Sequence, residues 1–175
     1  QHFQQQDAYH EWRLTQACRA IHPHAWGVRH LKLDTDALQT GVLRVLELQV
    51  VLPDGEMIHA PAEDELPPPV VLASLASAQE GCSVTFHLAT AAVRSQGSNM
   101  AASLTEADTA VRYHRSPMQV ADRYTDAVTA ELMTLRRSTK LLPDTSARDH
   151  LVSLPLLRLR RTSSGAFELD GRFMP

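Results

Sequence analysis

Histidine is the residue type of this chain with the widest chemical range, and nine are present among its 175 residues. The tightest group is His22-Pro23-His24, with His10 before it and His30 after it. Two histidines at positions i and i+2 of an extended segment are able to share a metal ion. No cysteine or carboxylate stands beside them at the spacing of a zinc site, and the proline constrains the pair. We therefore interpret the group as a polar connector between a helix and a strand, and expect no bound metal.

The side chains of a catalytic triad are present, but their pattern indicates no active site. Ser103, Asp108 and His114 are residue types that any chain of this length contains, and a triad is defined by geometry. No Gly-x-Ser-x-Gly motif occurs, and Ser164-Gly165 is typical of a hairpin turn. None of the seven glycines has the spacing of a phosphate-binding loop. The sequence therefore favours a protein that is not an enzyme and that needs no cofactor.

Two other sets of reactive side chains receive structural interpretations. The acidic run Glu63-Asp64-Glu65 lies in a predicted loop, where adjacent side chains point in different directions and do not form an acid–base pair. We predict a solvated loop there, the usual environment of charged side chains. Cys18 and Cys82 have no activating neighbours and are predicted to be small buried apolar residues. Two cysteines are also fewer than a disulfide-rich secreted domain carries, which favours a reducing, cytosolic location.

Overall charge and hydropathy argue against two classes of partner. The formal net charge is −3 and the isoelectric point is about 6.3, whereas nucleic acids and anionic membranes require a concentrated basic surface. Arg158, Arg160 and Arg161 lie in an alternating apolar run and are interpreted as one face of a strand. No apolar run approaches the roughly 20 residues that span a bilayer. We expect neither nucleic-acid binding nor direct membrane insertion.

The elements that would position these side chains begin with a helix. From Phe3 to Ile21 apolar residues recur at helical spacing. Pro23 ends the helix, because proline displaces the residue before it from helical backbone angles. We therefore divide the chain into a helix or arm at residues 1–25 and a second unit at residues 26–175.

Beyond residue 25 the periodicity becomes that of strands. Pro53-Asp54-Gly55 is a turn in which proline presets the first angle and glycine accepts a positive φ. Residues 120–142 fit either a helix or, from Glu131 onward, an alternating strand. The whole pattern predicts a mainly β domain, sandwich or barrel-like, with one N-terminal helix. The other predicted strands are residues 26–34, 42–52, 56–61, 82–93, 151–161 and 167–170, and residues 70–75 are a short apolar stretch.

Aromatic residues concentrate near the start of the chain, although they make up only 5% of it. Such a cluster forms either part of the core or a protein-docking surface, where tyrosine and tryptophan are enriched. The glutamine run beside them is either polar helix surface or a set of hydrogen-bonding groups for a partner backbone. The predicted partner-binding residues are Phe3, Gln4, Gln5, Gln6, Tyr9 and Trp12.

Several stretches, taken in their order and spacing, resemble the N-terminal part of the TssK family, baseplate subunits of the bacterial type VI secretion system. The resemblance covers both ends and much of the first half of the chain, and it omits the family's helical middle region and C-terminal domain. With no initiator methionine at Gln1, we expect this chain to be a piece of a longer protein. The stretches are HFQQQDAYHE, WGVRHLKLD, LPDGEMIHAP, DELPPPVVL, LPLLRL and FELDGRFMP.

The resemblance implies a structural adaptor rather than an enzyme. It implies a homotrimer whose N-terminal domain is a β-sandwich similar to the shoulder of siphophage receptor-binding proteins. That domain would dock onto the TssF–TssG wedge, while the absent C-terminal regions would reach the membrane complex. The implied location is the cytoplasm, at the inner face of the inner membrane of a Gram-negative bacterium. It also favours strand for residues 131–142.

Two alternatives of other classes remain open from the residues. A carbohydrate-binding module or hydrolase on a sandwich would need exposed aromatics on one sheet face, or two converging carboxylates. A metal enzyme would need further ligands around His22 and His24. The sequence leaves open which sandwich face would contact a neighbour.

Overall fold

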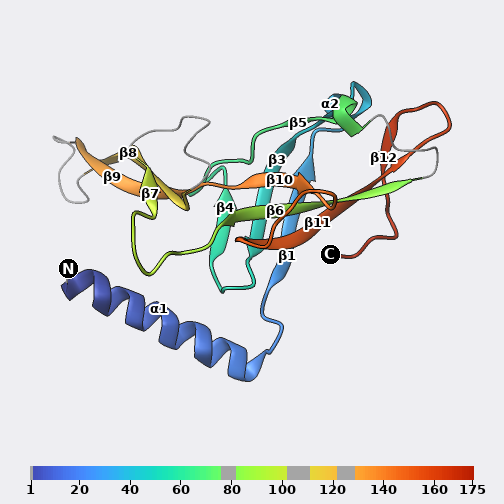
Figure 1. Cartoon of the computed structure of the whole chain (residues 1–175). Coiled ribbons are helices and arrows are strands. Elements are labelled where there is room, and N and C mark those ends of the chain that lie inside the picture. Colours follow the sequence, from blue (N-terminus) through green and yellow to red (C-terminus); the bar gives the residue numbers. More distant parts are fainter. Residues whose placement is uncertain (1, 76–81, 102–110, 122–128) are drawn as a thin grey trace.

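The computed structural model describes residues 2–75, 82–101, 111–121 and 129–175 and shows one long helix followed by a mainly β chain (Figure 1). No described helix is both long and apolar enough to cross a membrane. The elements in chain order are α1 (His2–Ile21), β1 (Gly27–Leu33), α2 (Thr35–Gln39), β2 (Val42–Leu43), β3 (Val45–Val51), β4 (Met57–Ala60), β5 (Val70–Val71), the 3-10 helix η1 (Leu72–Leu75), β6 (Ser83–Ala91), β7 (Met100–Ala101), β8 (Tyr113–Ala121), β9 (Thr129–Arg137), β10 (Lys140–Pro143), β11 (Leu151–Arg161) and β12 (Phe167–Leu169).

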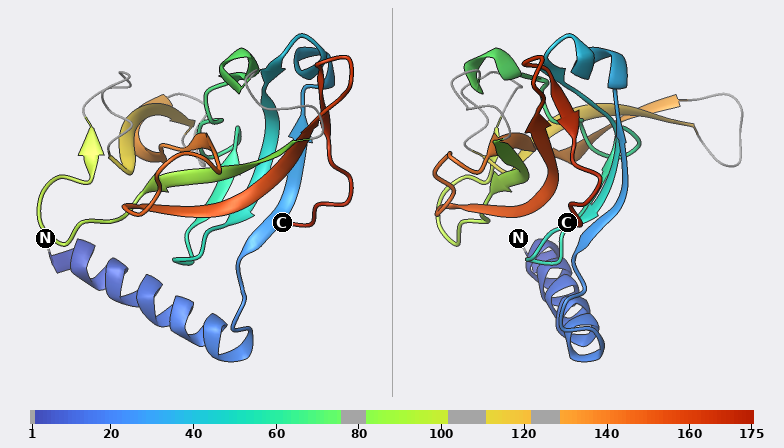
Figure 2. Two further views of the ribbon diagram at one scale, coloured as in Figure 1. Left: turned by 45° about the vertical axis from the view of Figure 1, so that its right-hand side comes forward. Right: turned by 90° about the vertical axis from the view of Figure 1, so that its right-hand side faces the viewer.

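Two of the sheets form the two layers of a sandwich (Figure 2). The first has the order β1-β3-β4 and the second the order β10-β6-β11-β12, with antiparallel pairing throughout both. A pair of short strands, β2 and β5, lies beside α2. The last sheet, with the order β7-β8-β9, extends from one end of the sandwich. The predicted mainly β fold with an N-terminal helix is therefore confirmed.

The core lies between the two sheets of the sandwich. In β3 the alternation of strand side chains places Leu48 and Val50 inside, while β6 is buried along most of its length because it is flanked by β10 and β11. Phe86 and Leu88 of β6 are fully buried. These residues belong to one apolar cluster with leucines of β11 from the same sheet. Burying apolar side chains from both layers is the main stabilising term of such a sandwich.

Most predicted elements occur where the sequence placed them. The Pro53-Asp54-Gly55 turn joins β3 to β4, with Gly55 at φ +96°. The ambiguous region contains the strands β9 and β10, so the strand alternative is correct from Glu131 onward. The Ser164-Gly165 turn joins β11 to β12, and Arg158 and Arg160 do lie on a strand. Helix α1 ends at Ile21 and β1 starts at Gly27, while the division of domains at residue 25 stays a prediction.

Several features differ from the sequence predictions, including strand β8, which was not predicted. The five-residue helix α2 was not predicted, although Asp34 caps it by accepting a hydrogen bond from the Ala37 amide at 2.9 Å. Cys18 and Cys82 are exposed rather than buried, so that prediction was wrong. Cys18 lies on a helix with no buried residue, and Cys82 precedes the first residue of β6. Neither position reaches the core between the sheets.

A core substitution tests the sandwich. We expect Phe86→Ala to lower the free energy of unfolding by about 4 kcal/mol, because it removes a fully buried ring and leaves a cavity. Val93→Ala, at an exposed position, serves as the control and should change it by less than about 0.5 kcal/mol. Denaturant-induced unfolding measures both variants. Equal losses in the free energy of unfolding would contradict the assignment of Phe86 to the core.

Candidate docking surface

The aromatic side chains predicted to bind a partner lie on an exposed helix. Phe3, Tyr9 and Trp12 are 82%, 53% and 57% exposed, and α1 has no buried residue. The rings of Tyr9 and Trp12 stack, with centroids 6.2 Å apart and an interplanar angle of 29°. The three glutamines at positions 4–6 are exposed as well. The core alternative is therefore wrong for these aromatics, while their binding role stays a prediction.

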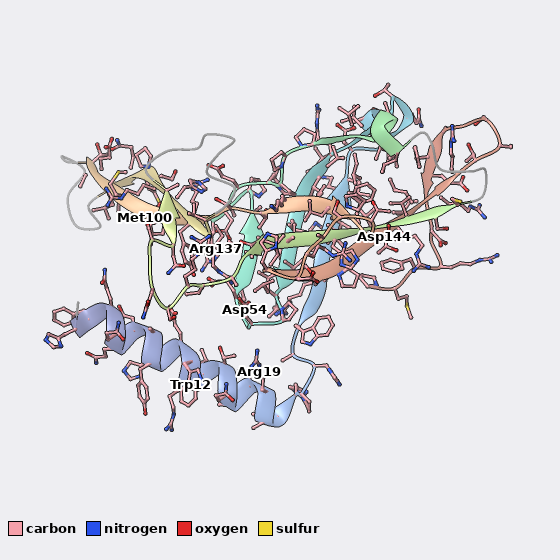
Figure 3. All side chains as sticks on the ribbon, viewed as in Figure 1. Trp12, Arg19, Asp54, Met100, Arg137 and Asp144 are labelled. Carbon is pink, nitrogen blue, oxygen red and sulfur yellow. The ribbon has the colours of Figure 1, made fainter. Side chains whose placement is uncertain are left out.

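Helix α1 contacts the sandwich through its second half. The Arg19 guanidinium donates a hydrogen bond from Nη2 to the Pro53 carbonyl at 2.6 Å. Figure 3 shows Arg19 on the side of α1 that faces the turn containing Asp54. A groove of about 210 Å³ lies between the helix and the turn. Its lining is mainly apolar and comprises Leu14, Thr15, Cys18, Arg19, Ala25, Trp26, Val51, Leu52, Pro53, Gly55 and Met57.

The first half of α1 lines none of this groove. Residues of an α-helix follow one another at about 100°, so Tyr9 lies on the side opposite Cys18, and Trp12 lies on the flank between them. Helices in proteins take most of their stability from packing an apolar face rather than from helix propensity. An unburied helix that carries a stacked tyrosine and tryptophan is therefore typical of an element that packs against another molecule.

The turn that supports α1 also belongs to a partly buried charge network, defined here as Asp54, Glu56, Asp64, Arg112, Tyr113 and Arg137. Arg112 is only 1% exposed and donates from Nη2 to Asp54 Oδ2 at 2.6 Å and to Glu56 Oε2 at 3.2 Å. Its Nη1 donates to the Ala91 carbonyl at 2.9 Å. A buried guanidinium is stable only when paired in this way, because unpaired charge is expensive to desolvate.

Arg137 completes the network from β9. Its Nε donates to Glu56 Oε1 at 2.5 Å, and its Nη1 donates to Asp64 Oδ1 at 3.2 Å. Asp64 is fully buried and also accepts hydrogen bonds from the backbone amides of His59 and Arg137, both at 3.0 Å. The prediction of a solvated acidic loop is therefore wrong for Asp64. The loop turns this side chain inward because two amides and a guanidinium there require an acceptor.

The network shifts the ionisation of its members. Burial alone would raise the pKa of Glu56, but the hydrogen bond with Arg137 and the charges of Arg137 and Arg112 outweigh it, so this pKa is lowered. Burial, and then the charge of Glu56, raises the pKa of Tyr113 to about 12. The Tyr113 hydroxyl donates to Glu56 Oε2 at 3.0 Å. Glu56 is therefore a carboxylate held in its charged form between two arginines.

Of the remaining sequence candidates, the described part of the chain includes His114 of the triad residue types and the histidines near Pro23. His114 is buried, with Nδ1 3.1 Å from Ser138 Oγ, and its Nε2 lies 3.0 Å from Glu65 Oε1 without hydrogen-bond geometry. Ser103 and Asp108 lie outside the described residues. Within the described ranges, no three His, Cys, Asp or Glu side chains group closely enough to hold a metal ion.

The exposed aromatics of the described chain also bear on carbohydrate binding. They are Phe3, Tyr9 and Trp12 on α1 and Trp26 just before β1. None of these four lies on the face of a sheet, where a glycan-binding platform would need them.

A second exposed apolar surface is the two-stranded ribbon β8–β9, which carries Met118, Leu132, Met133 and Leu135.

Removal of the central arginine tests the charge network. We expect Arg112→Met to lower the free energy of unfolding by about 3 kcal/mol, because Asp54 and Glu56 lose a buried partner. Arg160→Met breaks the exposed pair with Glu168 and should cost less than about 1 kcal/mol. Denaturant-induced unfolding measures both, and equal losses would contradict the importance of the buried pair.

The lowered pKa of Glu56 makes stability depend on pH. Its contribution is complete above the ordinary pKa of 4.5 and is lost as the pH falls through the lower value of the folded state. We expect the free energy of unfolding to decrease below pH 4.5. The Glu56→Gln variant should show a shallower decrease, because an amide does not titrate. Denaturant-induced unfolding at a series of pH values measures both slopes, and identical slopes would refute this role of Glu56.

Comparison with known proteins relates this arrangement to a family. The family model described as bacterial type VI secretion, VC_A0110, EvfL, ImpJ, VasE matches residues 2–175. A type VI secretion system baseplate component TssK1 from Pseudomonas aeruginosa is 41% identical over 70 residues, which are 40% of this chain and 16% of that protein.

Solved structures agree with this match. A chain of a TssK-TssF-TssG baseplate subcomplex of the type VI secretion system superposes with a TM-score of 0.88 at 26% identity, covering 99% of this chain and 56% of that one. A chain of a baseplate complex from the same kind of system gives 0.85 at 26% identity, covering 99% and 54%. The chain thus spans little more than half of these relatives. It belongs to the TssK family of type VI secretion baseplate components.

Proposed function

We propose that this chain is the docking part of a non-enzymatic adaptor, and that helix α1 attaches it to the TssF–TssG wedge of a baseplate. The unit at residues 26–175 acts as the shoulder that holds the arm at residues 1–25 in place. Phe3, Tyr9 and Trp12 provide the apolar contacts, and the glutamines at positions 4–6 provide hydrogen bonds at the same surface. Tyrosine and tryptophan suit this role because they combine a large apolar area with a polar group.

The observation that carries this proposal is the exposure of α1. A helix of 20 residues without a buried side chain leaves its aromatic rings open to solvent. One solved relative is described as part of a TssK-TssF-TssG baseplate subcomplex, which supports a protein partner of this kind. An exposed aromatic helix next to a well-packed sandwich fits attachment to a protein better than catalysis or ligand binding.

The proposal extends to a wider role, which membership of the family supports. The complete subunit forms a homotrimer, and regions beyond this chain connect the baseplate to the membrane complex. It works in the cytoplasm, at the inner face of the inner membrane of a Gram-negative bacterium. The sandwich corresponds in this proposal to the shoulder of a siphophage receptor-binding protein, a scaffold for assembly rather than chemistry.

Removal of the arm tests the proposal. In the full-length protein, deletion of residues 1–12 should abolish co-purification with TssF–TssG, because it removes all six predicted contact residues. The residues of α1 that line the groove, from Leu14 onward, remain in place. The sandwich should keep its unfolding midpoint, since the deleted segment contributes nothing to the core. Unchanged capture of TssF–TssG by the truncated protein would refute the role of the arm.

Point substitutions give a finer measurement. The double variant Tyr9→Ala/Trp12→Ala should weaken wedge binding by at least about 30-fold, the effect of losing roughly 2 kcal/mol at an interface centre. Val93→Ala removes exposed apolar surface from the sandwich instead and should leave the affinity unchanged. Isothermal titration measures both variants. A similar affinity for the two would show that the stacked rings are not at the interface.

A further inference from the structure

The turn between β3 and β4 divides its residues between two neighbours. The Pro53 carbonyl and Gly55 face helix α1, while the side chains of Asp54 and Glu56 belong to the charge network. Alternate residues of one tight turn therefore contact the helix on one side and the arginines of the charge network on the other. This arrangement gives the turn a role beyond joining two strands.

The contact between α1 and the turn depends on the absence of a side chain. A Cβ built on Gly55 would lie 2.7 Å from Thr15 Cγ2 and 3.0 Å from Thr15 Oγ1, closer than van der Waals contact allows. Gly55 also has φ +96°, where an L-residue is strained. Within the described helix, Thr15 alone is partly shielded from solvent, and every other residue of α1 is exposed. Glycine thus permits the closest approach of the helix to the sandwich.

The network holds the turn itself in position. Arg112 reaches both Asp54 and Glu56, and Arg137 reaches Glu56 from β9. Both arginines lie more than 50 residues away from the turn in sequence, on the segment that forms the β7-β8-β9 sheet. A turn bound on both sides of Gly55 has little freedom to move away from an added methyl group. The helix has more freedom, because its contacts with the body are few.

We propose that Gly55 is a positioning residue, which sets the direction of α1 and thereby the place at which Tyr9 and Trp12 are presented. This inference rests on the proposed docking of α1. A methyl group at position 55 would displace α1 at Thr15, and a helix tilted at that point moves its N-terminal aromatics furthest. The turn remains in place because Arg112 and Arg137 hold its carboxylates.

A matched pair of glycine substitutions tests this inference in the full-length protein. Gly55→Ala adds both the strain of a positive φ and the clash with Thr15. Gly165→Ala adds the strain alone, because Gly165 has φ +84° in the β11–β12 turn and its nearest neighbour, Arg161 Nη2, lies 3.6 Å from the added Cβ. Thr15→Ala in the Gly55→Ala background removes Cγ2 and Oγ1 and leaves Thr15 Cβ at an ordinary 3.5 Å.

The direct measurement is the distance between α1 and the sandwich. Spin labels at Gln6→Cys and Leu46→Cys, in a background without other cysteines, report it by double electron–electron resonance. We expect Gly55→Ala to shift or broaden the distance distribution, Gly165→Ala to leave it unchanged, and Thr15→Ala to restore it in the Gly55→Ala protein. An unchanged distance distribution for Gly55→Ala would overturn the inference, regardless of the affinity measured for TssF–TssG.

The second measurement is affinity for TssF–TssG. Gly55→Ala should weaken binding by about tenfold, Gly165→Ala by less than about twofold, and the rescued variant should bind nearly as the wild type does. If Gly55→Ala and Gly165→Ala bind alike while deletion of residues 1–12 abolishes binding, the positioning role fails and the docking role stands. If the deletion has no effect on binding, the docking role fails.

Discussion

The charge network around Arg112 is the interaction on which the arrangement of this domain depends. It connects three segments that the sandwich alone does not hold together: the β3–β4 turn, the loop at residues 61–65 and the base of the β8–β9 ribbon. Asp64 and Arg112 are almost completely buried, so each needs the opposite charge that the other segments supply. Apolar contacts alone would allow these three segments to shift relative to one another. Paired carboxylates and guanidinium groups fix the distance and the direction between the segments.

The helix receives its position from this network indirectly. Apolar burial between the two sheets gives the domain its stability, while α1 adds little to it because none of its residues is buried. Its contact with the body consists of the groove, the hydrogen bond from Arg19 and the close approach at Gly55. The sandwich core thus stabilises the domain, whereas helix α1 and its contacts with the body present the aromatic side chains. The proposed docking role requires this separation, since a contact surface must stay exposed until a partner covers it.

Local signals in the sequence were enough to predict many of the elements, although not α2 or β8. Helical spacing with Pro23 gave α1, the Pro53-Asp54-Gly55 pattern gave the turn, and alternation gave β6 and β11. Residues 131–142 needed the family resemblance, because Leu132 and Leu135 fit helical spacing as well as an exposed strand. The aromatics of α1 were also identified from the sequence as candidates for docking, although not as exposed residues.

The charge network was beyond prediction from one sequence, because its members pair across 56 to 81 residues. Nothing near Asp64 indicates that it accepts two amides and a guanidinium, and an acidic run between prolines is normally solvated. Likewise, the sequence marks Gly55 as a turn glycine but gives no sign that Thr15 lies against it. Tertiary contact, rather than local pattern, assigns the role of each of these residues.

The most direct test of the account is hydrogen–deuterium exchange of the full-length protein, alone and with TssF–TssG. We expect fast exchange for amides of residues 2–13 in the free protein, because none of these described residues is buried. In the complex we expect strong slowing of these amides, with the core strand β6 slow in both states. Equal exchange of residues 2–13 in both states, while TssF–TssG is bound, would contradict the claim that α1 is the docking element.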